Sequence, residues 1–223
     1  MARHKISTVD LVLHEIRQSI LTGSLAPGKA FTVSALAAQL GVSHVPVREA
    51  LRQLDAQGLV ILNPSRSATV APLDPAEVSA IYRLRLRLEP DLAAESAPYH
   101  SEDDIVGLRR LVDETFHSPP GEHRWGTHRA FHATLIQPAA SAWDLRVLNV
   151  LWDAAERYTR MVFDSIDATE EIDEARERAH LRLIDAAVSR DPAAVRDELH
   201  RHLSDNLTET LHGLDHIAGQ QRR

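Results

Sequence analysis

The stretch that decides the fold is LAAQLGVSHVPVREALRQLDAQGLV, which runs from residue 36 to residue 60. Its apolar residues recur at helical spacing on both sides of Gly41, and Gly41 and Gly58 are each placed to end a helix. We therefore predict a short helix, a tight turn at Gly41, and a second helix that begins at Ser43. Ser43 is a favoured capping residue, and Pro46 falls in the first helical turn, where proline is tolerated.

The residues on either side extend this pattern into a small domain. Upstream, STVDLVLHEIRQSILTG at residues 7–23 has the apolar spacing of a further helix. Downstream, LVILNPSRSATVAPL at residues 59–73 predicts two short strands joined by a turn at residues 63–65. The order helix, helix, turn, helix and hairpin is that of a winged helix-turn-helix, so we place such a domain over residues 1–73.

The rest of the chain, residues 74–223, shows helical patterns only. Asp74-Pro75 and Asp191-Pro192 each combine a capping residue with proline at the first helical position. Short links between helices favour antiparallel neighbours. We thus predict a mainly α protein, in which the winged helix-turn-helix is followed by an all-α antiparallel helical bundle. The six expected helices lie at residues 75–97, 101–116, 122–137, 142–163, 169–189 and 191–214.

Composition limits the classes of protein that fit. There is no cysteine, so disulfides and thiolate metal sites are excluded, and no apolar run approaches the ~20 residues of a membrane span. Residues 1–73 hold seven Lys or Arg against four Asp or Glu, a net +3, whereas the remainder holds 18 against 28, a net −10. We expect a cytoplasmic protein whose basic head meets an anion and whose acidic body does not.

These segments resemble a known family. ILTGSLAPGKAF at residues 20–31, the stretch at 36–60 and the hairpin look like the DNA-binding domain of GntR-family transcriptional regulators. In the second part, the resemblance is to the FCD subgroup of that family, whose helical domain binds an effector. It is carried there by IYRLRLRLEPDLAAESA at 81–97, FHATL at 131–135, AHLRLIDAAVSRD at 179–191 and HRHL at 200–203.

A helix-turn-helix reads DNA with the N-terminal residues of its recognition helix. Arg48 is suited to bidentate pairing with guanine, although an ion pair with Glu49 or Asp55 is the structural alternative. Arg52 lies one turn further on, and Arg66 lies at the hairpin tip. The residues expected at base edges or phosphates are Ser43, His44, Val45, Val47 and Arg48, with Arg52 and Arg66 as backbone and wing contacts.

Two positions depart from the family pattern. The family commonly has arginine where this chain has His44, and often another where it has Ser34. Fewer permanent cations at the interface should make DNA binding less dependent on salt.

The histidines of the body raise the question of a metal site. His128 and His132 are four residues apart, so both project from one face of a helix; this spacing suits a metal ion but also occurs on solvent-facing helices. His180 and His202 are each eleven residues from Asp191, so an antiparallel hairpin would place them level with each other. Spacing alone leaves open whether the two pairs converge.

The resemblance implies more. Many FCD domains hold a divalent metal with one Asp and three His, and the three histidines fall on His132, His180 and His202, while the aspartate falls on His128. Four neutral imidazoles would favour zinc, with nickel as an alternative. His128 would be either the fourth ligand or a residue that has swung out, and the remaining alternative is packed histidines without a metal. In similar domains the arginine at the position of Arg85 lies near the effector cavity.

We therefore expect a ligand-responsive regulator, and a repressor rather than an activator. It would bind palindromic double-stranded operator DNA as a homodimer and respond to a small organic acid. Two alternatives remain at this point: a metal sensor without an organic effector, and a metal-dependent hydrolase. The hydrolase is disfavoured because no carboxylate is poised beside the histidines as a general base.

Overall fold

The computed structural model describes residues 7–64, 67–119, 121–163 and 170–220. They form two compact units, one of Met1–Asp74 with Glu156–Met161 and one of Pro75–Ala155 with Val162–Arg223. Within the described ranges, no helix is long and apolar enough to cross a membrane.

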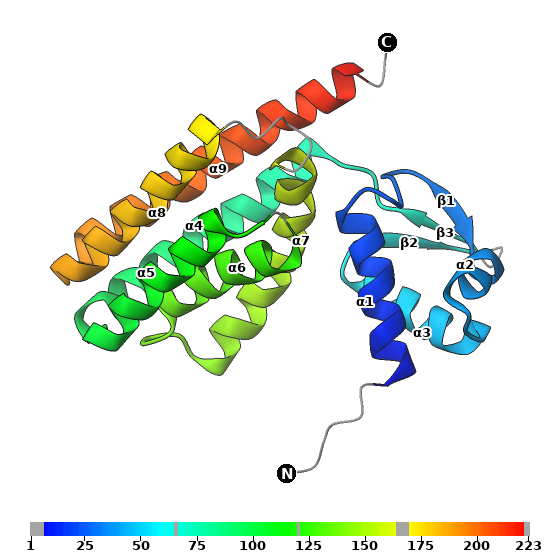
Figure 1. Cartoon of the computed structure of the whole chain (residues 1–223), viewed down its shortest axis with the longest axis horizontal. Coiled ribbons are helices and arrows are strands. Elements are labelled where there is room, and N and C mark those ends of the chain that lie inside the picture. Colours follow the sequence, from blue (N-terminus) through cyan, green and yellow to red (C-terminus); the bar gives the residue numbers. More distant parts are fainter. Residues whose placement is uncertain (1–6, 65–66, 120, 164–169, 221–223) are drawn as a thin grey trace. The chain divides into compact units, whose positions relative to one another are not determined.

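Within its described residues before Asp74, the first unit contains three helices and a small antiparallel sheet of order β1-β3-β2 (Figure 1). Its elements are α1 (Thr8–Leu21), β1 (Ala30–Thr32), α2 (Val33–Leu40), α3 (His44–Ala56), β2 (Val60–Asn63) and β3 (Ser67–Val70). The three helices and the hairpin were expected, and the fold is a winged helix-turn-helix. Strand β1 was not predicted, because three residues are too few to show an alternating pattern; it pairs with β3 in the register Phe31 opposite Ala68.

Local sequence explains how these helices begin and end. The side chains of Ser7 and Asp10 each accept a hydrogen bond from the other's backbone N–H, which forms a capping box at the start of α1. Gly41 ends α2 in the left-handed region, with φ of 65°, where a residue with a Cβ would be strained. Ser43 is the N-cap of α3, as predicted, but its side chain makes no capping hydrogen bond.

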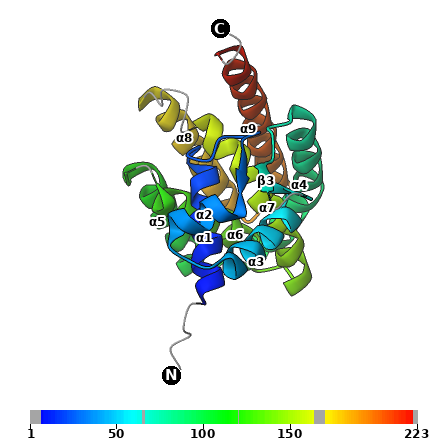
Figure 2. The same cartoon turned by 90° about the vertical axis from the view of Figure 1, so that its right-hand side faces the viewer.

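One apolar core holds the unit together. Figure 2 shows the helices α1, α2 and α3 that contribute to it from a second side. Helix α3 contributes Val47, Ala50, Leu51 and Leu54, all completely buried. Val47 therefore faces the core rather than DNA, so its expected place at the base edges is wrong. The reason is the helical period: Val47 lies three and four residues before Ala50 and Leu51 and shares their face.

The second unit contains six helices within its described residues, in the predicted order. They are α4 (Pro75–Ser96), α5 (Glu102–His117), α6 (Glu122–Ile136), α7 (Ala142–Phe163), α8 (Glu170–Ser189) and α9 (Pro192–Gln220), with a 3-10 turn, η1 (Ala97–Tyr99), after α4. Helix α4 packs along α9, and α5 contacts both α6 and α8 (Figure 1). Ser101 is a favoured capping residue and is predicted to cap α5. The prediction is confirmed, because its hydroxyl accepts a hydrogen bond from the N–H of Asp104.

The spacing of Leu183, Ile184 and Val188 predicts that all three lie on the buried face of α8, beside His180. Leu183 and Ile184 are completely buried, as predicted, but Val188 is 51% exposed and Ala187 takes the inner position. Around the helix axis, Ala187 lies about 40° and Ile184 about 100° from Leu183, whereas Val188 lies about 140° away, at the edge of the buried face.

Candidate metal centre

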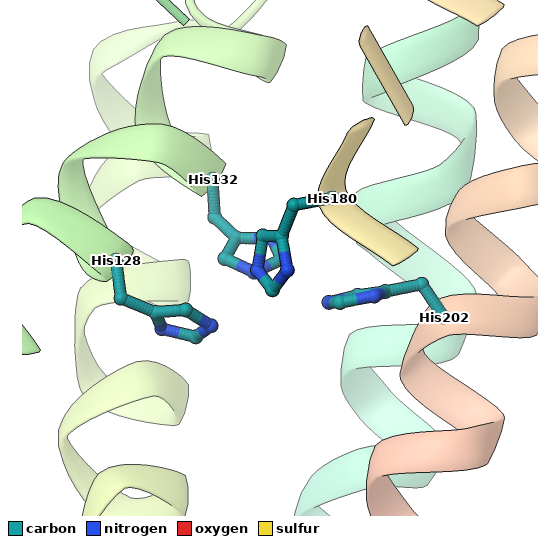
Figure 3. A group of neighbouring side chains, drawn as sticks. All are labelled: His128, His132, His180 and His202. Atoms are coloured by element: carbon teal, nitrogen blue, oxygen red, sulfur yellow. The ribbon is translucent and has the colours of Figure 1, made fainter. Parts of the chain in front are cut away.

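Four histidines from three helices converge inside the second unit (Figure 3). His128 and His132 come from α6, His180 from α8 and His202 from α9. Each offers a ring nitrogen, and the four nitrogens all lie within 4.8 Å of one another. The convergence that spacing left open is thus present, and His128 lies within the group.

The cross-hairpin pair has the expected relation. The ring centroids of His180 and His202 are 4.6 Å apart, and those of His132 and His202 are 5.2 Å apart. His200, two residues before His202, is exposed, as its angular position on α9 predicted. The helical period therefore separates an inward histidine from an outward one on the same turn.

Hydrogen bonding leaves ring nitrogens free to bind a metal. The carbonyl oxygen of Arg176 can only accept, so the His180 Nδ1 at 2.8 Å carries the proton and its Nε2 keeps a lone pair. Within the described residues, that Nε2 and both ring nitrogens of His132 are buried and have no hydrogen-bond partner. Buried polar atoms are seldom left in this state, and a bound ion is one explanation of it.

The electrostatic setting keeps the imidazoles neutral. Burial lowers the pKa of His180 to about 4, and it lowers the pKa of His132 and His202 well below the ordinary value. Burial also lowers the pKa of His128, with further contributions from His180 and from nearby arginines. Neutral imidazole is the form that coordinates metals.

The donor set fits a divalent transition metal. Zinc binds imidazole nitrogen at about 2.0–2.1 Å, which in a tetrahedral site places the nitrogens ~3.3 Å apart. The observed upper limit of 4.8 Å would close to that value with small side-chain movements. No carboxylate belongs to the group, so the ligands themselves would leave the ion's charge uncompensated.

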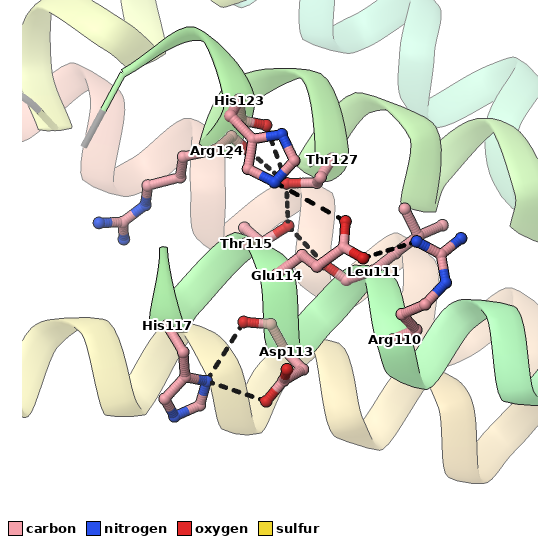
Figure 4. Close-up of polar contacts among 9 residues, drawn as sticks. All are labelled: Arg110, Leu111, Asp113, Glu114, Thr115, His117, His123, Arg124 and Thr127. Carbon is pink, nitrogen blue, oxygen red and sulfur yellow. Dashed lines mark hydrogen bonds and ion pairs between the residues drawn. The ribbon is translucent and has the colours of Figure 1, made fainter. Parts of the chain in front are cut away.

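His123 and His128 lie on the same helix but have different surroundings. His123 is 65% exposed, and its Nε2 lies 3.8 Å from a carboxylate oxygen of Glu114 on α5 (Figure 4). The neighbouring hydroxyl of Thr127 accepts a hydrogen bond of 2.9 Å from Thr115, also on α5. This bond ties α6 to α5 directly before His128 and so helps to fix the position from which His128 projects.

Arg85 is buried, but it already has a carboxylate partner. Its Nε donates to Glu89 at 2.5 Å, its Nη2 donates to the second oxygen at 3.3 Å, and both residues lie on α4. The indole N–H of Trp152 donates to Glu89 as well, at 3.0 Å. Burial is the largest cause of the lowered pKa of His128 and His202, and neighbouring histidines are the next. Arg85 is near enough to lower both pKa values further. Its exposed neighbours Arg83 and Arg87 point elsewhere.

Sequence reasoning missed a polar neighbour of this site. Asn206 lies one turn after His202 on α9, and its side-chain amide is 3.1 Å from the His202 Nε2. The spacing of four residues from a candidate ligand was the available signal. Two arginines have the same relation to other candidate ligands: Arg124 precedes His128 by four residues, and Arg176 precedes His180 by four.

The expected DNA-binding residues of the first unit lie on one exposed face of α3. Ser43, His44, Val45, Arg48 and Arg52 are all exposed. Arg52 donates to Glu49 at 3.0 Å, whereas within the described residues Arg48 has no hydrogen bond or ion pair. Asp55 accepts a hydrogen bond from the backbone N–H of Leu62, so it is not a partner of Arg48. Arg66 lies outside the described residues.

A winged helix-turn-helix whose recognition helix exposes Arg48 and Arg52 is the arrangement of a DNA-binding regulator, and here it is joined to a helical unit with a buried histidine cluster. Residues 8–70 match the model of the bacterial regulatory proteins of the gntR family, and residues 80–205 match the FCD domain. The chain therefore belongs to the GntR family of transcriptional regulators and carries an FCD domain. This family is one of regulators and not of enzymes, so the hydrolase alternative is set aside.

Several relatives align over most of their length. The chain is 30% identical to a protein of Paenarthrobacter nicotinovorans named "Probable D-xylose utilization operon transcriptional repressor", over 91% of this chain and 87% of that one. It is 25% identical to the transcriptional repressor GlaR of Escherichia coli, over 84% and 89%. The structure of E. coli McbR/YncC superposes with a TM-score of 0.75 at 21% identity, covering 98% of this chain and all of that one. That likeness shows a shared fold.

Proposed function

We propose that this regulator is a repressor whose helical domain binds a divalent metal, zinc in the first instance, together with a small carboxylate effector. The observation that carries the proposal is the set of four neutral histidines whose ring nitrogens lie within 4.8 Å of one another, several of them without a partner. His128, His132, His180 and His202 would be the ligands. When bound, the metal supplies a cation on which an effector carboxylate can be held.

The remaining assignments follow from the first unit and from the relatives. The residues proposed to contact operator DNA are Ser43, His44, Arg48, Arg52 and Arg66. Two copies of the chain would bind a palindromic operator, one half-site each. Repression is proposed because GlaR is named a repressor. Arg85 is proposed to line the effector cavity, where the bidentate contact with Glu89 would have to be shared or exchanged.

The experiment is metal binding by the full chain. Purified protein treated with a chelator is dialysed against zinc, and bound zinc is measured by elemental analysis. We expect one zinc per chain and a higher melting temperature of the zinc-loaded protein, because a ligand that binds only the folded state stabilises it. His132→Ala should lose both effects.

Two exposed histidines provide matched controls. His123→Ala on α6 and His200→Ala on α9 remove imidazoles from the same helices without touching the cluster, so both should bind zinc like the unchanged protein. An unchanged melting temperature with no bound zinc rejects the metal site. A change in operator affinity on addition of zinc alone would instead favour the metal-sensing alternative.

A further inference from the structure

Two arginines lie beside the histidine cluster and are not used by the proposed metal site. Arg124 is one turn before His128 on α6, and Arg176 is one turn before His180 on α8. Residues four apart on a helix lie on the same face, so both guanidinium groups project on the side of the cluster. Burial is the largest cause of the lowered pKa of His128. Arg124 and Arg176 lower this pKa further, although less than His180 and Arg85 do.

A single carboxylate holds the two arginines together. An oxygen of Asp173, in the first turn of α8, lies 2.7 Å from the Arg124 Nη2 and 3.7 Å from the Arg176 Nη1. The Arg176 Nε lies 3.4 Å from the more exposed Glu209, and its guanidinium stacks 3.6 Å from the ring centroid of Phe163. Among the described residues, these contacts use only some of the five N–H donors of each guanidinium, so donors are available for a further acceptor.

These side chains are partly exposed to solvent and are not sealed in the core. The Arg124 and Arg176 side chains are 17% and 15% exposed, and that of Asp173 is 26% exposed. An ion pair that is this accessible to water is weak, and another anion can compete for it. A fully buried pair such as Arg85 with Glu89 is far harder to open, because separation would leave a charge buried without a partner.

The charge balance around the cluster indicates which kind of anion would compete with Asp173 for the two arginines. Around the cluster, Arg85 is balanced by Glu89, and Arg124 and Arg176 are balanced by Asp173 and Glu209. A divalent metal held by four neutral imidazoles then adds two positive charges that no ligand compensates. A ligand with one negative group would leave half of that charge uncompensated, whereas a ligand with two would balance it.

We propose that Arg124 and Arg176 form an anion-binding subsite beside the metal, occupied by Asp173 until a dianionic ligand displaces it. Such a ligand places one carboxylate on the metal and the other on the two guanidinium groups, which suit the planar, bidentate geometry of a carboxylate. This inference rests on the proposed metal site and narrows the effector from carboxylates in general to dicarboxylates.

The test is a comparison of ligands matched in length. Zinc-loaded full-length protein is titrated calorimetrically with malonate, succinate and glutarate, and with propionate, butyrate and valerate, which lack the second carboxylate. We expect at least one dicarboxylate to bind about tenfold more tightly than its partner, which is the effect of one charge-assisted hydrogen bond. In Arg124→Gln and Arg176→Gln this preference should fall to near unity, while zinc stoichiometry and monocarboxylate affinity stay unchanged.

The direction in which Asp173→Asn changes dicarboxylate affinity decides whether Asp173 occupies the subsite. If Asp173 only supports the fold, its loss should weaken ligand binding or leave it unchanged. If Asp173 occupies the subsite, its loss should tighten dicarboxylate binding severalfold, because the competing anion is gone. Arg178→Gln is the matched control: Arg178 lies on the same helix, is 58% exposed and pairs with Glu174, so this change should leave the preference intact.

The outcomes separate the two proposals. No bound zinc overturns the proposed metal site and this inference with it. Bound zinc without a dicarboxylate preference overturns the inference alone. The inference is likewise overturned if the preference survives in both arginine variants, or if Asp173→Asn weakens dicarboxylate binding or leaves it unchanged.

Discussion

His128 decides the charge of the proposed metal site. By family resemblance this position would hold an aspartate, and the structure places the histidine with its ring 4.9 Å from that of His132 and 5.1 Å from that of His180. A carboxylate there would cancel one charge of a divalent ion, and an imidazole cancels none. The substitution therefore preserves the number of ligands while it raises the demand for an external anion.

The buried histidines also make the metal-free protein sensitive to acid. In the unfolded chain a histidine titrates near ~6.5, whereas the pKa of His180 in the folded chain is about 4 and that of His132 is also lowered. Below about pH 6.5 the unfolded state binds more protons, so the stability present above that pH is lost as the pH falls toward about 4. Urea unfolding of metal-free protein at about pH 7.5 and about pH 5 measures this loss.

Two variants determine whether the histidine cluster causes the loss of stability at acid pH. His132→Leu removes one buried imidazole and should reduce the difference between the two pH values. His200→Leu removes an exposed imidazole from α9 and should leave the difference as it was. If the free energy of unfolding changes equally between the two pH values in both variants, the acid sensitivity arises elsewhere.

At the scale of elements, the site depends on how closely the helices approach one another. Gly213 on α9 has no room for a side chain, because an added Cβ would lie 2.1 Å from the Cγ1 of Val162 on α7. Val162 is completely buried, so it has little space into which it can move. The sequence shows only a glycine inside a helix, and the contact that requires it comes from a helix about 50 residues earlier in the chain.

Gly213→Ala should therefore destabilise the helical unit. Overpacking of this kind typically costs about 1–3 kcal/mol, against which the better helix propensity of alanine returns up to ~1 kcal/mol. Thermal unfolding followed by circular dichroism measures the net effect. Gly219→Ala, on the same helix with nothing within 4 Å of the added Cβ, is the control and should be neutral or stabilising.

A second substitution separates overpacking from other causes. Val162→Ala removes the methyl groups that the new Cβ would meet, so the double variant should be more stable than the sum of the two single effects predicts. If the two changes in stability simply add in the double variant, the proposed clash between the new Cβ and Val162 is contradicted.

At the scale of the whole molecule, charge is divided between the two functions. The first 73 residues carry a net +3 and the remainder a net −10. Since DNA repels an acidic surface and attracts a basic one, specific binding has to come from the few cations of the head. We expect Arg48 to contribute most, because it is exposed and, within the described residues, has no ion pair to give up.

Arg48→Ala should abolish preference for the operator while nonspecific DNA binding remains. The operator is first selected from random duplexes with the unchanged protein, and affinities for it and for an unrelated duplex are then compared by gel shift. Loss of a bidentate guanine contact costs about 1–3 kcal/mol, or roughly tenfold to a hundredfold in specificity. Arg87→Ala, an exposed arginine of α4, controls for loss of charge, and unchanged specificity of Arg48→Ala would refute its assignment.

Most of the architecture could be predicted from the sequence, because helix periodicity and capping are local. Capping boxes at Ser7 and Ser101 and the left-handed Gly41 set helix ends through contacts within a few residues. Strand β1 could not be predicted in this way, since its three residues acquire their pairing only from β3. Val188 was assigned to the wrong face because it lies at the edge of the apolar stripe of α8, where packing partners decide the orientation. Val47 lies in the middle of the buried stripe of α3, so the helical period by itself places it in the core.

The sequence by itself determined that four histidines lie on three helices, two of them level across a hairpin and two on one helical face. It could not determine that the two pairs meet, because no local rule fixes how α6 packs against α8 and α9. Only the tertiary structure brought the four imidazoles together, paired Arg85 with Glu89 and Trp152, and set Asp173 between Arg124 and Arg176. Spacing places side chains on a helix, whereas burial and charge pairing depend on residues that are distant in the chain.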